Sequence, residues 1–159
     1  MISNIATKGI NGIPNIPGDK SISHRSIIIP SISKGTCEIN NILKSADVLH
    51  TLDAFKSMGV SITENKEKLL IHGKGLTALC ESKNPIYLGN SGTSARLLTG
   101  LLSAQKFKSV LIGDGSLSKR PMGRISEPLT QMNAKIYTTN GSLPLTIKSS
   151  SLKPVNIDL

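Results

Sequence analysis

Aromatic residues are scarce in this chain: 159 residues contain two Tyr, two Phe and no Trp. The core must therefore be built mainly from Ile, Leu, Val and Ala. Proteins that bind single-stranded nucleic acid usually stack bases on aromatic side chains, so the scarcity argues against a nucleic-acid partner. The net charge of +9 leaves two readings open. The surface is merely rich in Lys, or it attracts small anionic metabolites.

Cysteine is also rare, with only Cys37 and Cys80 present. They lack the C-x-x-C spacing of metal and redox sites, and His24, His50 and His72 do not cluster with them in the sequence. We therefore expect no metal site. We expect both cysteines to be reduced and buried in the core, which fits a cytoplasmic location.

Long apolar runs are absent from the sequence. No segment approaches the roughly 20 apolar residues that span a bilayer, and the first eight residues lack the apolar run of a signal peptide. The longest local run, Ile27-Ile28-Ile29, is predicted to lie in the core. We expect no membrane partner.

The sequence does contain an internal repeat, in which the same order of helices and strands occurs twice. Apolar spacing predicts helices at 21–33, 45–58, 93–102 and 121–132, and strands at 36–40, 60–63, 69–72, 86–88, 109–112, 134–137 and 143–147. Residues 58–62 (MGVSI) match residues 132–136 (MNAKI), and Asp53 falls on Glu127 at the same offset. The chain is therefore predicted to be an α/β protein with two α-β-α-β-β units, each preceded by a short strand.

Residues 17–25 (PGDKSISHR) have the anatomy of a small-anion site. A helix starting near Ser21 places Ser21 and Arg25 on one face, at positions i and i+4. Lys20 then stands at the electropositive end of that helix. These three side chains are candidate anion ligands.

Two further motifs repeat this arrangement, at residues 89–96 (GNSGTSAR) and 118–124 (SKRPMGR). The first is a glycine loop before a helix, where free N–H groups favour an anion, although it is not a Walker A loop. Arg96 fits a ligand and a structural salt-bridge former equally well. In the second motif, we expect Lys119 to be a solvated surface charge. The guanidinium of Arg120 can bind a carboxylate or phosphate through two hydrogen bonds. If the two repeats pack together, the N-termini of these helices could converge on one binding site.

The three motifs, in this order and spacing, resemble signatures of the 5-enolpyruvylshikimate-3-phosphate synthase family. The resemblance implies an inside-out α/β barrel built from repeated β-α-β-α-β-β units, with two of the usual units present. Residues 1–17 would belong to the family's other domain, 18–84 to the first unit and 85–159 to the second. The third unit and the second domain would be missing.

The resemblance implies transfer of the enolpyruvyl group from phosphoenolpyruvate to the 5-hydroxyl of shikimate 3-phosphate, with release of phosphate. Shikimate 3-phosphate would be bound by Lys20, Ser21 and Arg25. Phosphoenolpyruvate would be bound by Lys20, Asn90, Gly92, Thr93 and Arg120. The family uses no metal or organic cofactor. The Lys-Ser…Arg set favours shikimate 3-phosphate over the acceptor of the related UDP-N-acetylglucosamine enolpyruvyl transferases.

Family members are more than twice as long as this chain. We therefore expect a truncated or split N-terminal part that is inactive alone and contains no certain catalytic residue. A complementary C-terminal fragment or a second copy would be its protein partner. Two alternatives stay open: a non-catalytic basic module that binds RNA or protein, and a decayed remnant.

Overall fold

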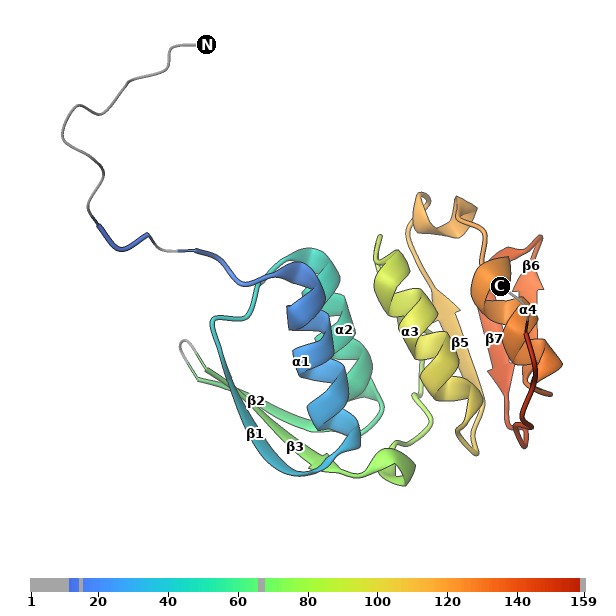
Figure 1. The fold of residues 1–159 in the computed structure, drawn as a ribbon, viewed down its shortest axis with the longest axis horizontal. Coiled ribbons are helices and arrows are strands. Elements are labelled where there is room, and N and C mark those ends of the chain that lie inside the picture. Colours follow the sequence, from blue (N-terminus) through green and yellow to red (C-terminus); the bar gives the residue numbers. More distant parts are fainter. Residues whose placement is uncertain (1–11, 15, 66–67, 158–159) are drawn as a thin grey trace, which may run out of the picture.

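The computed structural model describes residues 12–14, 16–65 and 68–157 of the chain. The chain forms two halves, each with two α-helices packed against a sheet (Figure 1). The elements of the first half are α1 (Lys20–Ile32), β1 (Lys34–Asn40), α2 (Ala46–Ser57), β2 (Ser61–Asn65), β3 (Lys68–Lys74) and the 3₁₀ turn η1 (Leu76–Ala78). Those of the second half are β4 (Ile86–Tyr87), α3 (Gly92–Ser103), β5 (Ser109–Ile112), the 3₁₀ turn η2 (Leu117–Lys119), α4 (Gly123–Gln131), β6 (Lys135–Thr139) and β7 (Ser142–Lys148).

Both sheets place their last strand between the two before it. The strand order is β1-β3-β2 in the first sheet and β4-β5-β7-β6 in the second. Thus β1, β3 and β2 take the places of β5, β7 and β6, and all these pairs are antiparallel. The second sheet adds β4, which runs parallel to β5.

The short strand that was expected before the first unit is not found there. Among the described residues ahead of α1, none forms a strand, and the Ile13 side chain is fully exposed. Pro14 and Pro17 lie in this stretch and lack the N–H that strand pairing requires. Within the described residues, a leading strand is therefore found for the second unit alone.

Aliphatic side chains from both halves form one buried cluster. Ile27 and Ile71 of the first half and Leu98, Leu111 and Ile147 of the second are fully buried in it. The core is mainly aliphatic, as expected. It also contains Phe55, Met58 and Met122, which are fully buried and were not expected there. The helices therefore lie between the two sheets and tie the halves together.

Two expectations about burial were wrong. Cys37 and Cys80 are free thiols, but both are exposed rather than in the core. Cys37 lies on β1, at the edge of its sheet, and Cys80 lies in the segment that joins the halves. Of the isoleucine run, Ile27 is buried but Ile29 is 56% exposed, because α1 is covered on one side only. In the part of the chain that the structure describes, no helix is long and apolar enough to cross a membrane.

Gly89 offers a test of the junction between β4 and α3. Its φ is +55°, and a Cβ there would overlap the His50 ring. We expect Gly89→Ala to lower the free energy of unfolding by about 2 kcal/mol or more, because left-handed strain and a clash combine. Gly100→Ala is the matched control, since nothing lies within 4 Å of a Cβ in that helical position.

The control substitution should raise stability by about 0.5–1 kcal/mol, because Ala is the better helix former. Urea unfolding followed by circular dichroism measures both variants. Equal effects of the two substitutions would contradict the packing described for Gly89.

Candidate functional site

The start of α1 is fixed by its own motif. The Asp19 carboxylate accepts a hydrogen bond of 2.7 Å from the Ile22 N–H and caps the helix. A Cβ at Gly18 would overlap the Asn41 carbonyl oxygen, so only glycine fits there. Lys20 occupies the first turn and donates through Nζ to Asp47 Oδ2, in the first turn of α2. The candidate lysine therefore lies where two helix N-termini meet.

A buried polar network connects α1, α2 and α3. His24 Nδ1 lies 2.9 Å from Thr51 Oγ1 and 3.3 Å from Ser94 Oγ. Thr51 Oγ1 and Ser94 Oγ are 2.6 Å apart, and Ser94 Oγ is 2.6 Å from Ser91 Oγ. All four side chains are buried. The N-terminal ends of α1 and α3 are thus held beside each other by hydrogen bonds.

His24 is neutral in this setting. Burial lowers the pKa of its imidazole below the ordinary value of about 6.5, and the Lys20 charge lowers the pKa further, against an opposing effect from Asp47. Its Nε2 is buried without a hydrogen-bond partner. An unprotonated Nε2 leaves only a lone pair unsatisfied, whereas an N–H there would strand a donor. The network therefore favours the proton on Nδ1.

The second and third motifs meet at the N-terminus of α3. Arg120 donates through Nη2 to Asn90 Oδ1 across 30 residues of sequence. A Cβ at Gly92 would lie 2.8 Å from Arg96 Nη1 and 3.1 Å from Arg120 Nη1. The loop after β5 is tied back to the glycine loop, because the Asp114 N–H donates to the Gly89 carbonyl at 2.9 Å. Two guanidinium groups thus border the position where Gly92 has no side chain.

Arg96 is largely engaged with the backbone. Its guanidinium donates to the Gly92 carbonyl at 3.2 Å and to the Pro121 carbonyl at 3.3 Å. These bonds join the start of α3 to the segment before α4. Of the two roles that the sequence left open for Arg96, the structural one is the better supported.

The other residues that the sequence predicted as ligands lie on the exposed surfaces of α1 and α3. Ser21 and Arg25 are exposed on α1, and Thr93 is exposed in the first turn of α3. Arg25 lines a groove between α1 and β1, apart from the Asn90–Arg120 contact.

The sequence did not single out Asp47 or the His24 network. Asp47 falls within the helix predicted at 45–58, and Ser91 and Ser94 fall within the glycine-loop motif at 89–96. The spacing of Lys20 from Asp47, and of His24 from Thr51, is 27 residues in each case. The equal spacing is a weak signal, because it appears only when α1 and α2 are already placed side by side.

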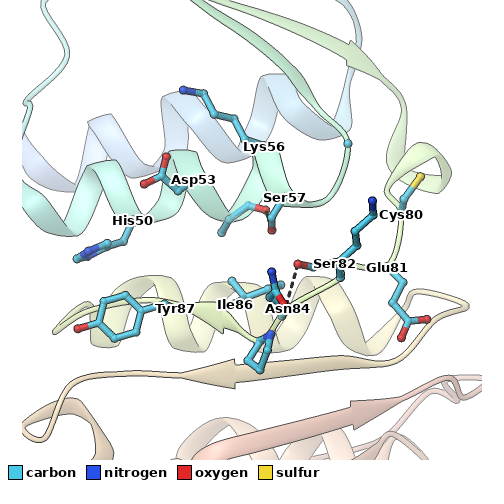
Figure 2. A pocket seen from close by; sticks show the side chains of 14 residues that line it. His50, Asp53, Lys56, Ser57, Cys80, Glu81, Ser82, Asn84, Ile86 and Tyr87 are labelled. Atoms are coloured by element: carbon cyan, nitrogen blue, oxygen red, sulfur yellow. Dashed lines mark hydrogen bonds between the residues drawn. The ribbon is translucent and has the colours of Figure 1, made fainter.

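A cavity of about 510 Å³ lies away from the predicted residues, between α2 and residues 80–87. In Figure 2, His50 of α2 lies opposite Tyr87 of β4, whereas the Asp53 and Lys56 side chains extend from α2 away from Ser82 and Tyr87. The His50 and Tyr87 rings meet edge to face at 5.1 Å. Within the described ranges, no group of three or more His, Cys, Asp or Glu side chains is placed to hold a metal ion.

The fold and these helix starts define a mixed α/β protein that gathers cationic side chains at neighbouring helix N-termini. The family model for EPSP synthase (3-phosphoshikimate 1-carboxyvinyltransferase) matches residues 6–159. The chain belongs to the EPSP synthase family.

The similar proteins agree with that assignment. The chain is 51% identical over 154 residues to the 3-phosphoshikimate 1-carboxyvinyltransferase of Ruthia magnifica, covering 96% of this chain and 35% of the relative. It is 48% identical to the Leuconostoc citreum enzyme, covering 95% and 36%. A solved EPSP synthase from Acinetobacter baumannii superposes with a TM-score of 0.89 at 50% identity, over 93% of this chain and 34% of that one. The chain thus spans about a third of the length of these relatives.

The His24 network makes stability depend on pH. The unfolded chain binds a proton on His24 near pH 6.5, whereas the folded chain resists it, so the unfolded state binds more protons as the pH falls. The free energy of unfolding should be at its full value above about pH 6.5 and decline below it. Urea unfolding between pH 5 and 7.5 measures the slope.

The His24→Gln variant should be less stable and should lose much of this slope. His72→Gln, on the outer face of the first sheet, is the control and should keep it. A wild-type slope in the His24 variant would show that the network does not carry the effect.

Proposed function

We propose that this chain is the N-terminal part of a 3-phosphoshikimate 1-carboxyvinyltransferase, supplying one wall of the substrate site. The observation that carries the proposal is the contact of Arg120 with Asn90 beside Gly92, at the helix start next to the Lys20 helix. The reaction moves the enolpyruvyl group of phosphoenolpyruvate to the 5-hydroxyl of shikimate 3-phosphate and releases phosphate. Both substrates are small polyanions, which suits these cations and helix N-termini.

Phosphoenolpyruvate is assigned to Lys20, Asn90, Gly92, Thr93 and Arg120. Asn90 accepts one bond from the Arg120 guanidinium and so orients it, and the other N–H groups remain for a phosphate or carboxylate. Lys20 likewise has three donors, of which Asp47 takes one. The hydrogen-bonded network beneath keeps these groups at fixed separation, which favours an anion of matching size.

Shikimate 3-phosphate is assigned to Lys20, Ser21 and Arg25. All three lie on the first two turns of α1, and Ser21 and Arg25 are both solvent-accessible. An accessible guanidinium can bind a carboxylate through two parallel bonds. Accessibility and residue type support this part of the proposal, together with membership of the family.

The arrangement of domains follows from the same proposal. Residues 18–84 and 85–159 would be two repeat units of an inside-out α/β barrel, and residues 1–17 would belong to the other domain. The equivalent strand orders of the two sheets support the division into units. The cytoplasmic location inferred from the unpaired cysteines stays a prediction.

The proposed enolpyruvyl transfer requires side chains that act as acid and base. Protonation of the enol carbon, attack by the hydroxyl and loss of phosphate each move a proton. Three of the carboxylates near the motifs are already engaged: Asp19 caps α1, Asp47 binds Lys20, and Asp114 accepts the Ser116 and Leu117 N–H groups. We therefore assign proton transfer to the two thirds of the relatives that lie outside the match.

The roles of neighbouring cations can be separated by one pair of variants. Arg120→Ala should weaken phosphoenolpyruvate binding by roughly 10-fold or more, because it removes charged hydrogen bonds. Lys119→Ala removes the same charge from the adjacent, exposed position and should change binding less than twofold. A phosphoenolpyruvate titration followed through backbone amide NMR signals measures both. Equal losses would indicate general charge attraction and contradict a built site.

The isolated chain should not turn over. Phosphate release from phosphoenolpyruvate and shikimate 3-phosphate should stay at the background rate, even at concentrations where phosphoenolpyruvate binding is detectable. Phosphate release that rises with chain concentration and disappears in Lys20→Ala would show that one wall suffices, and would overturn this part of the proposal.

A further inference from the structure

The second sheet has one face that the described helices leave uncovered. α3 and α4 pack on its other face, where Leu111, Leu145 and Ile147 are buried (Figure 1). We define the outer face by six residues at the alternate positions of the four strands: Tyr87, Val110, Ile112, Tyr137, Thr146 and Lys148. Each of the six is exposed or half-buried. The strand register brings them together, because Val110 lies opposite Thr146, which lies opposite Tyr137.

Both tyrosines of the chain lie on the outer face. Tyr87, on β4 opposite Ile112, is 47% exposed, and Tyr137, on β6, is 54% exposed. The two phenylalanines are placed differently, since Phe55 is fully buried and Phe107 packs against the core. The strand order separates the tyrosines by three strand spacings, about 14 Å. The few aromatic residues of this chain therefore include two exposed rings on one face, of the kind on which bases stack.

Two lysines lie beside the Tyr137 ring. Lys135 and Lys148 are directly opposite each other on β6 and β7, and Lys148 Nζ is 5.1 Å from the Tyr137 ring centroid. Neither lysine forms an ion pair with a described carboxylate. Like charges opposite each other destabilise a sheet, so an anion bound beside them would be favourable. Residues 85–159 contain nine Lys and Arg against three Asp and Glu, which gives this half +6 of the net charge of +9.

The first sheet repeats the lysine pair but not the rings. Lys34 lies opposite Lys74 at the end of β3, just as Lys148 ends β7. The strands β1, β2 and β3 contain no Tyr, Phe or Trp. Their exposed face instead carries an ion pair of 2.7 Å between Glu38 and Lys68. The combination of exposed rings with lysines is therefore not required by the fold, and the first sheet is an internal control for charge alone.

The cavity beside α2 adjoins the outer face through Tyr87. Tyr87 lines it together with His50 and Asn84, and the His50 and Tyr87 rings meet edge to face at 5.1 Å (Figure 2). His50 thereby orients the Tyr87 ring, and the polar side chains offer hydrogen-bond partners to the edge of a base. Asp53 and Glu81 also line the cavity, which makes it a poor place for phosphate. A base therefore fits at the Tyr87 end of the face, and phosphate groups fit at the lysine end.

We propose that the outer face binds single-stranded RNA, with bases stacked on Tyr87 and Tyr137 and phosphate groups beside Lys135 and Lys148. In one common RNA-binding module, exposed aromatic side chains on a four-stranded sheet stack two or three bases of a single strand. An acidic peptide fits less well, because it would pair with the lysines but leave both rings without a flat partner. This binding is independent of the enolpyruvyl transfer proposed above, whose assigned residues lie outside β4, β5, β6 and β7.

Fluorescence anisotropy with a labelled oligouridylate of about 12 nucleotides tests the proposal, since single-strand sites cover roughly 4–16 nucleotides. We expect binding that weakens as the salt concentration rises. Tyr137→Ala should weaken binding roughly tenfold, because a stacked base is lost, whereas Tyr137→Phe keeps the ring and should stay within about twofold of the unchanged chain. Lys148→Ala should lower the slope of log affinity against log salt by about 0.7, the value for one phosphate contact on a single strand.

Lys74→Ala is the matched control, since it removes the same charge from the equivalent strand end of the first sheet. It should leave the salt slope unchanged and alter the affinity less than about twofold. Lys20→Ala should leave RNA binding unchanged, and Tyr137→Ala should leave phosphoenolpyruvate binding unchanged, so this inference and the proposed function fail separately.

Equal losses in Lys148→Ala and Lys74→Ala, or full affinity in Tyr137→Ala, would indicate general charge attraction and overturn the proposal. An absence of RNA binding at low salt would also overturn it. Displacement of the labelled RNA by polyglutamate as effectively as by unlabelled RNA would assign the outer face to an acidic protein segment instead.

Discussion

The contact of His24 with Thr51 and Ser94 is the constraint on which the rest of the arrangement depends. It is buried, and it joins α2 to the two helices, α1 and α3, whose N-termini carry motif residues. Removing the His24 side chain would take one hydrogen-bond partner from both Thr51 and Ser94 in the interior. This contact fixes how far the Lys20 helix stands from the Asn90–Gly92 loop, and so sets the spacing of cations that a ligand would meet.

Local signals in the sequence predicted most of the secondary structure. Apart from the short strand expected before the first unit, each predicted helix and strand is found within a few residues of its expected bounds, because the caps and turns are encoded nearby. Asp19 caps α1, Ser91 caps α3, and Asn140 and Gly141 both take positive φ in the turn before β7. Pro121 was expected in the first turn of the last helix, but α4 begins at Gly123 and leaves Pro121 outside.

Contacts between distant residues could not be predicted in the same way. The pairing of Lys20 with Asp47, and of Arg120 with Asn90, depends on how helices and loops pack after they form. The exposure of Cys37 and Ile29 has a similar origin. Both residue types favour burial, but whether an edge is covered is decided by elements elsewhere in the fold. Hydrophobicity alone therefore misplaced Cys37 and Ile29 in the core, because it does not report which helix face or sheet edge is covered.

The ion pair between Lys20 and Asp47 also bears on how a phosphate could bind. A lysine that must leave its carboxylate to meet a ligand would lose that bond on binding. Lys20 Nζ has three N–H donors, and its side chain remains 51% exposed while paired, so a phosphate can bind without displacing Asp47. Asp47 then lowers the net positive charge of the empty wall and orients the ammonium group. Asp47 therefore orients the Lys20 ammonium group and still leaves two of its N–H donors for an anion.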